Sequence, residues 1–215
     1  MSKLFSPVPM SSWPQRQVYN MFRNYKDPYF EVCLQLEISR VHHFARANHI
    51  SLYFCLCYLC TKAANMLPNW HYRFYKKHPV YYYTLNPSCT DKRPQETTFH
   101  FVNGMYNPNK DMVSFVKEIT DLSRCKDSFL IRHPQDDPNS HIYFTSLPWL
   151  PFTSMVNLHP NGKYNGCPSI AFGKYQWQND QLLMPISIQV NHLLLNGEDV
   201  GEFYQTLQQL IGQLS

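Results

Sequence analysis

Apolar positions recur with two different periods along this chain, and the two periods predict strands and helices in alternation. Over residues 30–38 apolar residues alternate with polar ones, which is typical of a strand with one buried face. Over residues 112–125 they recur every three or four positions, which predicts a helix with one buried face. The stretch 41–67 is dense in apolar and aromatic residues and ends at Pro68, so it predicts one long buried helix.

The other elements follow from the same patterning and from turn residues. A helix at residues 15–25 begins after Trp13-Pro14, and a polar loop with two prolines fills residues 127–140. The sequence further predicts one or two strands over residues 72–85, strands at residues 97–102, 141–145, 169–176 and 181–192, and a C-terminal helix after Asn196-Gly197. We find no repeat, and 215 residues suit one sizeable core, so we expect a single α/β or α+β domain over residues 1–215.

Charge and composition exclude several classes of function. The formal net charge is +4 and the basic residues form no run longer than a pair, which gives nucleic-acid binding little support. The glycine motifs of dinucleotide and phosphate loops do not occur, which excludes simple Rossmann and P-loop enzymes. The first ten residues lack the apolar core of a signal peptide, and the apolar run 52–60 is about half a bilayer span. We therefore expect a cytoplasmic protein without membrane contact.

The cysteines and the aromatic residues indicate packing. Three of the seven cysteines, Cys55, Cys57 and Cys60, lie in the apolar run without the second pair of a paired C-x-x-C metal motif, so we interpret them as core residues. With 15 Tyr, 14 Phe and 4 Trp, the chain carries more aromatic surface than a core alone requires. This abundance favours contacts between subunits.

His192 is the residue whose position most suggests chemistry. It continues the apolar face of the predicted strand 181–192 and precedes the turn signal Asn196-Gly197. Strand ends are where α/β enzymes place their reactive groups, and partial burial favours the neutral imidazole that a general base needs. A histidine satisfied within the core fits the same pattern, so the strand alone leaves both interpretations open.

Three segments in the last third of the chain, and a fourth near its start, resemble chloramphenicol acetyltransferases. Residues 187–201 read S-I-Q-V-N-H-L-L-L-N-G-E-D-V-G, similar to the family's catalytic segment, in which H-H-x-x-x-D-G follows a strand ending in Q-V. Residues 145–154 are similar to its S-x-x-P-W-x-x-F-x-S segment, and residues 173–185 to its K-Y and L-[LM]-P run. Trp13, Tyr19 and Phe22, with the strand that follows, resemble its first helix and strand. The middle of the chain is too divergent to carry positions over.

The resemblance implies acetyl-CoA-dependent O-acetylation in a ternary complex, without an acyl-enzyme and without a metal. His192 Nε2 would take the proton of the acceptor hydroxyl, which then attacks the thioester of acetyl-CoA. Thr145 stands at the position of the family's serine and would donate a hydrogen bond to the tetrahedral oxyanion, with Ser146 as the fallback. A threonine chosen for its strand propensity is the other interpretation of Thr145.

The resemblance also implies how the co-substrate and the subunits are arranged. Trp149 and Tyr175 fall at family positions beside the pantetheine and adenine of CoA, with Lys174 next to them, although core aromatics and a solvated lysine fit the same pattern. The implied fold is a two-layer sandwich, a mixed β-sheet packed against helices. The implied assembly is a homotrimer in which His192 faces a pocket built largely by the neighbouring subunit.

The sequence departs from the family beside the expected base. The family's aspartate four residues after the histidine is Asn196 here, and its arginine partner is Gln15. Replacing one member of a buried ion pair leaves the other charge buried without a partner and destabilises the protein. Replacing both members by groups that hydrogen-bond each other changes the stability little. We therefore expect a neutral hydrogen-bonded amide pair between Gln15 and Asn196; the alternative is that Arg16 pairs with Asp199.

Further departures bear on rate and acceptor. Asn191 replaces the first histidine of the motif and Ala171 replaces a threonine that holds a water near the reacting centre. Lys26 and Pro28 replace the leucine and the cysteine of the antibiotic pocket, so the acceptor could differ from chloramphenicol. The pair His42-His43 resembles the first letters of the motif, but no aspartate-glycine follows it, and we interpret it as surface or capping residues.

Three functions remain open from the sequence. The first is acetyl transfer to a hydroxyl of chloramphenicol or a similar xenobiotic, and the second is acyl transfer to another alcohol or amine by the same histidine. The third is a trimeric homologue that binds ligand or CoA without turnover, which Gln15, Asn196 and Ala171 favour and His192, Thr145 and Trp149 oppose.

Overall fold

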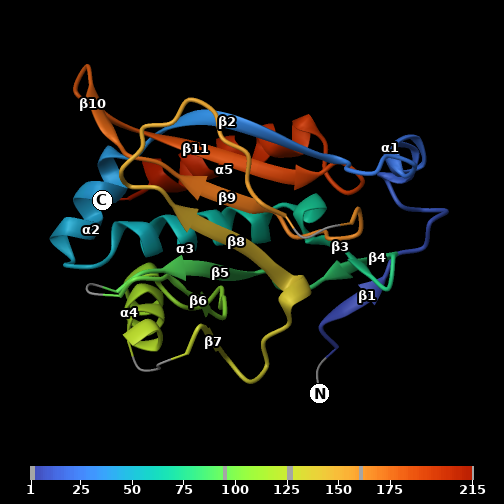
Figure 1. Cartoon of the computed structure of the whole chain (residues 1–215), viewed down its shortest axis with the longest axis horizontal. Helices are drawn as coiled ribbons and strands as arrows, with labels where there is room; N and C mark the ends of the chain where they lie inside the picture. Colours follow the sequence, from blue (N-terminus) through green and yellow to red (C-terminus); the bar gives the residue numbers. More distant parts are fainter. Residues whose placement is uncertain (1–2, 94–95, 125–127, 160–161, 215) are drawn as a thin grey trace.

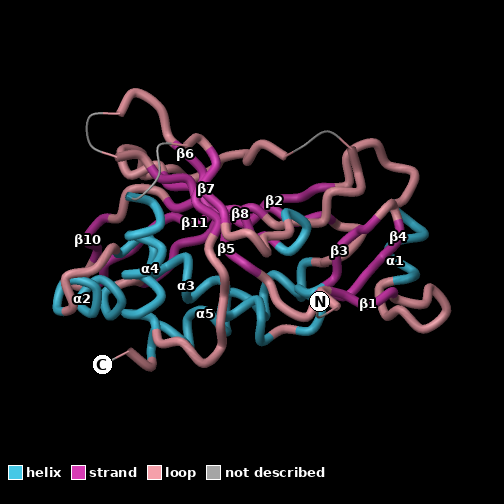
Figure 2. The backbone as a smooth tube through the Cα atoms, turned by 90° about the horizontal axis from the view of Figure 1, so that it is seen from below, coloured by secondary structure: helices cyan, strands magenta, loops and turns pink. Residues whose placement is uncertain are grey.

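A mixed sheet runs through the molecule, and helices lie against one of its faces (Figures 1 and 2). The computed structural model describes residues 3–93, 96–124, 128–159 and 162–214. In the described residues the sheet has eight strands. Seven of them follow the order β10-β11-β9-β8-β5-β6-β7, and the eighth, β2, pairs with β11 on the edge opposite β9. The α/β sandwich expected from the family resemblance is confirmed.

The sheet combines antiparallel and parallel pairs. Strand β11 runs antiparallel to β2, β9 and β10, whereas β8 runs parallel to both β5 and β9. The eight strands are β2 (Tyr29–Glu37), β5 (Asn86–Asp91), β6 (His100–Asn103), β7 (Leu130–Arg132), β8 (His141–Ser146), β9 (Ser169–Phe172), β10 (Gln176–Gln178) and β11 (Gln181–Asn191). A separate antiparallel sheet holds β1 (Phe5–Pro7), β4 (His78–Tyr82) and β3 (Tyr72–Tyr75) in the order β1-β4-β3.

The helical layer is built around α3 (Leu52–Met66), which contacts the three other long helices and also β5 and β8. The helices are α1 (Arg16–Phe22), α2 (Ser39–Ala47), α4 (Met112–Arg124) and α5 (Gly197–Gly212), with 3-10 turns η1 (Pro68–His71) and η2 (Pro138–Ser140). Helix α3 buries ten of its side chains, because it lies between the sheet and the outer helices. In the described part of the chain, no helix has the length and apolar character that crossing a membrane requires.

The three cysteines of α3 lie in the core, as predicted. Cys55, Cys57 and Cys60 are fully buried. Burial raises the pKa of the Cys55 thiol to about 12 and raises the pKa of the Cys57 thiol well above its usual value. These thiols stay protonated at neutral pH and act as small apolar side chains.

The single helix predicted over residues 41–67 is wrong, because the chain forms α2 and α3 with a turn between them. His49 adopts a left-handed conformation with φ 54°, and its N–H donates to the carbonyl of Arg46 at 3.2 Å. The N–H of Ile50 donates to the carbonyl of Ala45 at 3.0 Å. This pair of bonds is the Schellman motif, which ends a helix. Ser51 then caps α3 by accepting from the N–H of Phe54 at 3.4 Å.

Replacing His49 with glycine should stabilise the protein. The left-handed conformation costs a residue with a Cβ roughly 1–2 kcal/mol, and glycine adopts it freely. Because part of this gain is offset by the greater freedom of glycine in the unfolded chain, we expect about 1 kcal/mol in urea unfolding. His49→Ala, which keeps the Cβ, is the matched control and should give no such gain; equal stabilities of the two variants would contradict the prediction.

Of two further predicted segments, the loop differs from the structure and the strand region agrees with it. The predicted loop 127–140 contains the short strand β7 and the turn η2, whereas residues 125–127 lie outside the described residues. The predicted strand region 72–85 is the hairpin of β3 and β4, turned by Lys76 and Lys77 with φ 48° and 69°. Strand β5 was not predicted, because Asn86-Pro87 at its start is a turn signal.

Candidate active site

His192 lies one residue beyond the end of β11, where aromatic residues hold its ring. Its backbone N–H donates to the carbonyl of Pro28 at 2.7 Å, which ties this end of β11 to the chain just before β2. The imidazole stacks on Phe22 of α1, with ring centroids 4.5 Å apart, and lies 5.0 Å from Phe30 of β2. The two rings leave the imidazole half-buried and restrict its rotation.

A backbone carbonyl determines which imidazole nitrogen carries the proton in the neutral ring. His192 Nδ1 lies 3.2 Å from the carbonyl oxygen of Leu195. Since a carbonyl oxygen only accepts hydrogen bonds, Nδ1 must hold the proton and donate it. The lone pair of the neutral ring is then on Nε2, the atom that a general base would use.

Asn191 holds the turn that carries His192. Its side-chain amide donates to the carbonyls of Lys163 and Asn165 at 2.8 and 2.9 Å, and its Oδ1 accepts from the N–H of Leu193 at 2.9 Å. The backbone carbonyl of Asn191 accepts from Leu195 N–H at 3.0 Å. The residue at the first position of the family motif therefore braces the turn rather than the imidazole.

The expected amide pair between Gln15 and Asn196 is wrong, and both residues contact Asp199 instead. Gln15 Nε2 donates to Asp199 Oδ2 at 3.4 Å, and the backbone N–H of Asn196 donates to the same oxygen at 2.7 Å. The Oδ1 of Asn196 caps α5, accepting from the N–H groups of Glu198 and Asp199 at 2.8 and 3.1 Å. A capping box is therefore more favourable here than an amide pair. The alternative, a pair between Arg16 and Asp199, is correct for Asp199 but not for Arg16, because the side chain that contacts Asp199 is that of Gln15.

Thr145 lies near the end of β8, with its hydroxyl beside that of Thr90. The Thr90 and Thr145 hydroxyl oxygens lie 3.1 Å apart, and the Thr90 hydroxyl also lies 3.4 Å from the Phe144 carbonyl, so the single Thr90 hydrogen can serve either acceptor. Tyr53 of α3 donates to the carbonyl of Phe144 at 3.0 Å, so the end of β8 is fixed from the helical layer as well. Thr145 and Ser146 are both half-buried.

Within one chain, His192 and Thr145 lie at opposite ends of the sheet. Thr145 pairs with Ala171 on β9, which pairs with Ser187 on β11, five residues before His192. Five residues span about 17 Å along a strand and two strand spacings add about 10 Å across it, so the two side chains are roughly 20 Å apart. Figure 1 shows the β8 and β11 arrows pointing toward opposite ends of the sheet. One copy of the chain does not bring these two groups together.

A cavity of about 500 Å³ lies beside the Thr145 end of the sheet. Lys174 and Tyr175 line it together with Ser146, Pro148, Phe172 and Gly173, and the start of α3 closes another side with Ser51, Leu52, Tyr53 and Leu56. Trp149 is 70% exposed and is not among the lining residues. Two of the three expected CoA-contacting residues thus share one cavity.

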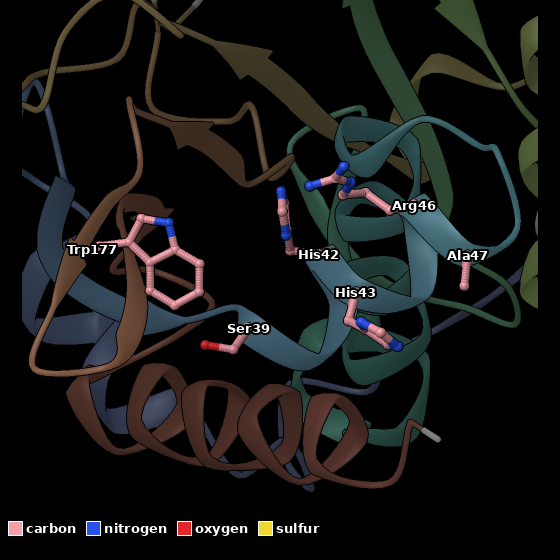
Figure 3. Close-up of a pocket in the computed structure, with 6 residues that line it drawn as sticks. All are labelled: Ser39, His42, His43, Arg46, Ala47 and Trp177. Carbon is pink, nitrogen blue, oxygen red and sulfur yellow. The ribbon is translucent and has the colours of Figure 1, made fainter.

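A second cavity, of about 610 Å³, lies between α2 and β10 and contains none of the expected catalytic residues (Figure 3). Figure 3 shows Trp177 of β10 on one side and His42 with Arg46 of α2 on the other. The His42 ring stands edge-on to Tyr175 at 5.5 Å, so this pair separates the two cavities. His43 is exposed near the start of α2, as expected for a surface residue. We assign the candidate site by chemistry rather than by cavity size.

The remaining departures from the family motif lie in ordinary positions. Ala171 is fully buried in β9, Pro28 is buried before β2 and Lys26 is exposed. Within the described ranges, no group of three or more His, Cys, Asp or Glu side chains is arranged to hold a metal ion.

Sequence reasoning missed two parts of the site. The Leu195 carbonyl, which fixes the imidazole, is a backbone group, and Asn69, which donates to Asp199 Oδ1 at 2.7 Å, lies 130 positions away. Only the capping-box spacing of Asn196 and Asp199 was available from the sequence as a signal.

Comparisons with known proteins identify the family of the chain. The sequence profile described as "Chloramphenicol acetyltransferase" matches residues 3–208. Chloramphenicol acetyltransferase 2 of Escherichia coli is 24% identical over 206 residues, covering 95% of each chain, and a chloramphenicol acetyltransferase of Clostridium perfringens is 23% identical over 208 residues, covering 96% of this chain and 94% of that one.

Solved structures share the fold. A chloramphenicol acetyltransferase superposes with a TM-score of 0.84 at 20% identity, covering 96% of this chain and 99% of that one. A dihydrolipoamide acetyltransferase of Azotobacter vinelandii superposes with a TM-score of 0.68 at 13% identity, covering 99% and 92%. That structure was solved to examine the catalytic roles of a serine, a histidine and an asparagine four positions after the histidine. With the profile match over nearly its whole length, this chain belongs to the chloramphenicol acetyltransferase family, a family of acyltransferase enzymes.

Proposed function

We propose that this protein is a cytoplasmic acetyl-CoA-dependent O-acetyltransferase that acts on small hydroxylated molecules, with chloramphenicol as the first candidate acceptor. The observation that carries the proposal is the contact between His192 Nδ1 and the Leu195 carbonyl. The Nδ1–H of the imidazole is held by this carbonyl, so the free lone pair is on Nε2, in a ring positioned by Phe22 and Phe30.

The reaction proceeds by direct attack in a ternary complex. His192 Nε2 takes the proton of the acceptor hydroxyl while the oxygen attacks the thioester carbonyl of acetyl-CoA. The tetrahedral intermediate carries its negative charge on the former carbonyl oxygen, and the Thr145 hydroxyl donates a hydrogen bond to it. When the intermediate collapses, the imidazolium returns its proton to the sulfur, so CoA leaves as the thiol and the acceptor leaves as the acetyl ester.

The active site is shared between two copies of the chain in a homotrimer. The separation of roughly 20 Å between His192 and Thr145 within one chain supports this, because a hydrogen-bonded site needs the two groups within a few ångströms of one substrate. The segment 149–158 also exposes apolar side chains, with exposed fractions of 70% for Trp149, 80% for Val156 and 97% for Leu158. Such side chains are typical of a subunit interface.

Acetyl-CoA enters through the cavity lined by Lys174 and Tyr175. The aromatic face of Tyr175 suits stacking on the adenine or packing on the pantetheine, the Lys174 ammonium suits a phosphate, and exposed Trp149 extends the same surface. Ser146 lines the cavity one residue after Thr145, so a thioester reaching that depth lies close to the oxyanion donor.

Asn196 is compatible with catalysis. The dihydrolipoamide acetyltransferase studied for its catalytic histidine also has an asparagine four positions later, the spacing of His192 and Asn196. Here the asparagine caps α5 and so fixes the turn that bears the imidazole. Another alcohol or an amine is the alternative acceptor, since Lys26 and Pro28 alter the positions of the family's antibiotic pocket.

The test measures free CoA released from acetyl-CoA with a thiol reagent, with and without chloramphenicol. We expect turnover that requires the acceptor and falls by about 10²–10⁴-fold in His192→Ala, because general-base catalysis contributes about that much. His78→Ala, which removes an exposed histidine of β4, is the matched control and should keep native turnover.

Two outcomes would count against the proposal. Turnover of the native protein with other alcohols or amines, but not with chloramphenicol, would replace the acceptor and keep the chemistry. Binding of acetyl-CoA by a folded protein that releases no thiol with any acceptor would show a homologue that has lost catalysis.

A further inference from the structure

The carboxylate of Asp199 is buried at the start of α5 and is held by uncharged donors. The residue is 3% exposed. Its Oδ1 accepts from Asn69 Nδ2 at 2.7 Å, and its Oδ2 accepts from the backbone N–H of Asn196 at 2.7 Å and from Gln15 Nε2 at 3.4 Å. These amide donors come from three separate parts of the chain and fix the carboxylate in one orientation.

The carboxylate contacts the same peptide group that holds the catalytic imidazole. The N–H of Asn196, which donates to Asp199, and the carbonyl of Leu195, which accepts from His192 Nδ1, belong to one planar peptide unit. The sequence of contacts is therefore carboxylate, peptide N–H, peptide carbonyl, imidazole N–H. The proposed base and a buried acid are connected without touching each other.

A carboxylate on the N–H side makes the peptide carbonyl a better acceptor. Hydrogen bonds in series polarise one another by roughly 10–30% per bond in a medium of low dielectric constant. The rigid peptide plane also transmits position, because a carbonyl that cannot tilt holds the imidazole N–H where it is. Both effects favour the tautomer with the proton on Nδ1 and the lone pair on Nε2.

We propose that Asp199 is a positioning residue for His192 and acts through the Leu195–Asn196 peptide. The proposal rests on the proposed function of His192 as the general base. The alternative is that Asp199 only stabilises the start of α5 as part of its capping box. This alternative does not require the carboxylate to affect the imidazole, so the two hypotheses predict different results.

The test is Asp199→Asn, with kcat and KM measured separately and the ring nitrogens of His192 observed by ¹⁵N NMR. We expect kcat to fall by about 10–100-fold, the usual loss when the residue that orients a functional histidine is changed. The KM for acetyl-CoA should stay within about 2-fold, because Asp199 lies away from the CoA cavity. In the native protein the neutral ring should carry its proton on Nδ1, and in the variant both tautomers should be populated.

Glu198→Gln is the matched control. It removes the same charge from the same first turn of α5, but Glu198 is exposed and its side chain does not reach the Leu195–Asn196 peptide through any hydrogen bond seen in the described residues. It should leave kcat and the His192 tautomer unchanged. If both variants change the tautomer equally, the charge at the helix start is responsible and the proposal is overturned.

Further outcomes keep the proposal falsifiable. If Asp199→Asn does not fold because its new amide faces the amide of Asn69, Asp199→Ser removes the charge without that conflict and replaces it in the test. A folded variant with native kcat and the native tautomer overturns the proposal, as does an Nε2–H tautomer in the native protein itself. Failure to find any acceptor contradicts the proposed function, and the NMR comparison still decides the role of Asp199.

Discussion

Subunits carrying His192→Gln and subunits carrying Thr145→Val should each be nearly inactive alone and should recover about a quarter of native turnover when refolded together in equal amounts. The first change removes the proposed base, for a loss of about 10²–10⁴-fold. The second removes the proposed oxyanion donor, for a loss of about 10²–10³-fold. Valine keeps the shape of the threonine, so the fold of β8 should survive.

The recovery follows from the positions of the two residues in the sheet. Because they lie at opposite ends of it in one chain, a complete site in the proposed homotrimer would take its histidine from one copy and its threonine from the next. In a randomly mixed trimer, the histidine of a given site is intact with a chance of about one half, and so is its threonine. About one site in four is therefore complete. Turnover is measured as thiol release from acetyl-CoA with the acceptor found for the native protein.

The control mixes two differently tagged subunits that both carry His192→Gln, and no activity should return. Mixtures that regain turnover should also contain both tags in one particle, which confirms that subunits of the two kinds have assembled together. If mixed particles form and turnover stays at the level of the separate variants, the two residues do not serve one shared site.

Asp136→Asn should destabilise the protein by about 2–4 kcal/mol at pH 7, because it changes a buried acid that holds two other elements. Asp136 Oδ1 lies 2.6 Å from His141 Nε2 at the start of β8, and its Oδ2 accepts from Asn103 Nδ2 of β6 at 2.8 Å. The side chains of His141 and Asp136 are 2% and 1% exposed. An asparagine supplies an acceptor to only one of these partners and turns an N–H toward the other.

The loss should depend on pH in a defined direction. Burial alone would raise the pKa of the Asp136 carboxyl, but the hydrogen bonds from His141 and Asn103, together with the nearby charges of His141 and Arg132, outweigh it and hold this pKa below its usual range. A lowered folded pKa means that the carboxylate stabilises the fold above about pH 4, its ordinary pKa in an unfolded chain, and ceases to do so as pH falls through the folded pKa. The difference between native and variant should therefore be complete at pH 5–7 and shrink below about pH 4.

Urea unfolding at several pH values measures this difference. Asp121→Asn, at an exposed position of α4, is the matched control and should change the free energy of unfolding by less than about 0.5 kcal/mol. A difference between native and Asp136→Asn that grows as the pH falls below 4 would contradict the assignment.

Much of the fold could be predicted from periodicity because apolar side chains occupy one face of several strands and helices, even where the polar face is buried as well. Strands β2 and β11 each present an apolar face to the helical layer, so their alternation was visible and placed His192 at a strand end. Strand β5 was hidden because it is central and carries Asn86-Pro87, whose local signal indicates a turn. The break between α2 and α3 was hidden because His49, unlike glycine, gives no warning of a left-handed conformation.

The sequence suggested the residue types of the proposed site but not the contacts that these residues make. Family resemblance led to His192 and Thr145, but the partner of Gln15 is 184 positions away in Asp199, and spacing along the chain carries no information about such a bond. The expected amide pair assumed that Gln15 and Asn196, which both differ from the family's residues, contact each other directly. Instead a third residue, already buried as part of a helix cap, accepts hydrogen bonds from both.

The exposed apolar segment 149–158 has a consequence for how the chain behaves at different concentrations. If this segment is covered by neighbouring copies, a chain released by dilution turns Trp149, Val156 and Leu158 toward water, and dissociation lowers its stability together with its activity. Folding and assembly are then linked by mass action, so the temperature of unfolding rises with protein concentration. For such a protein the amount made is itself a determinant of stability, and a chain expressed at a low level would be lost to aggregation or proteolysis before it could assemble.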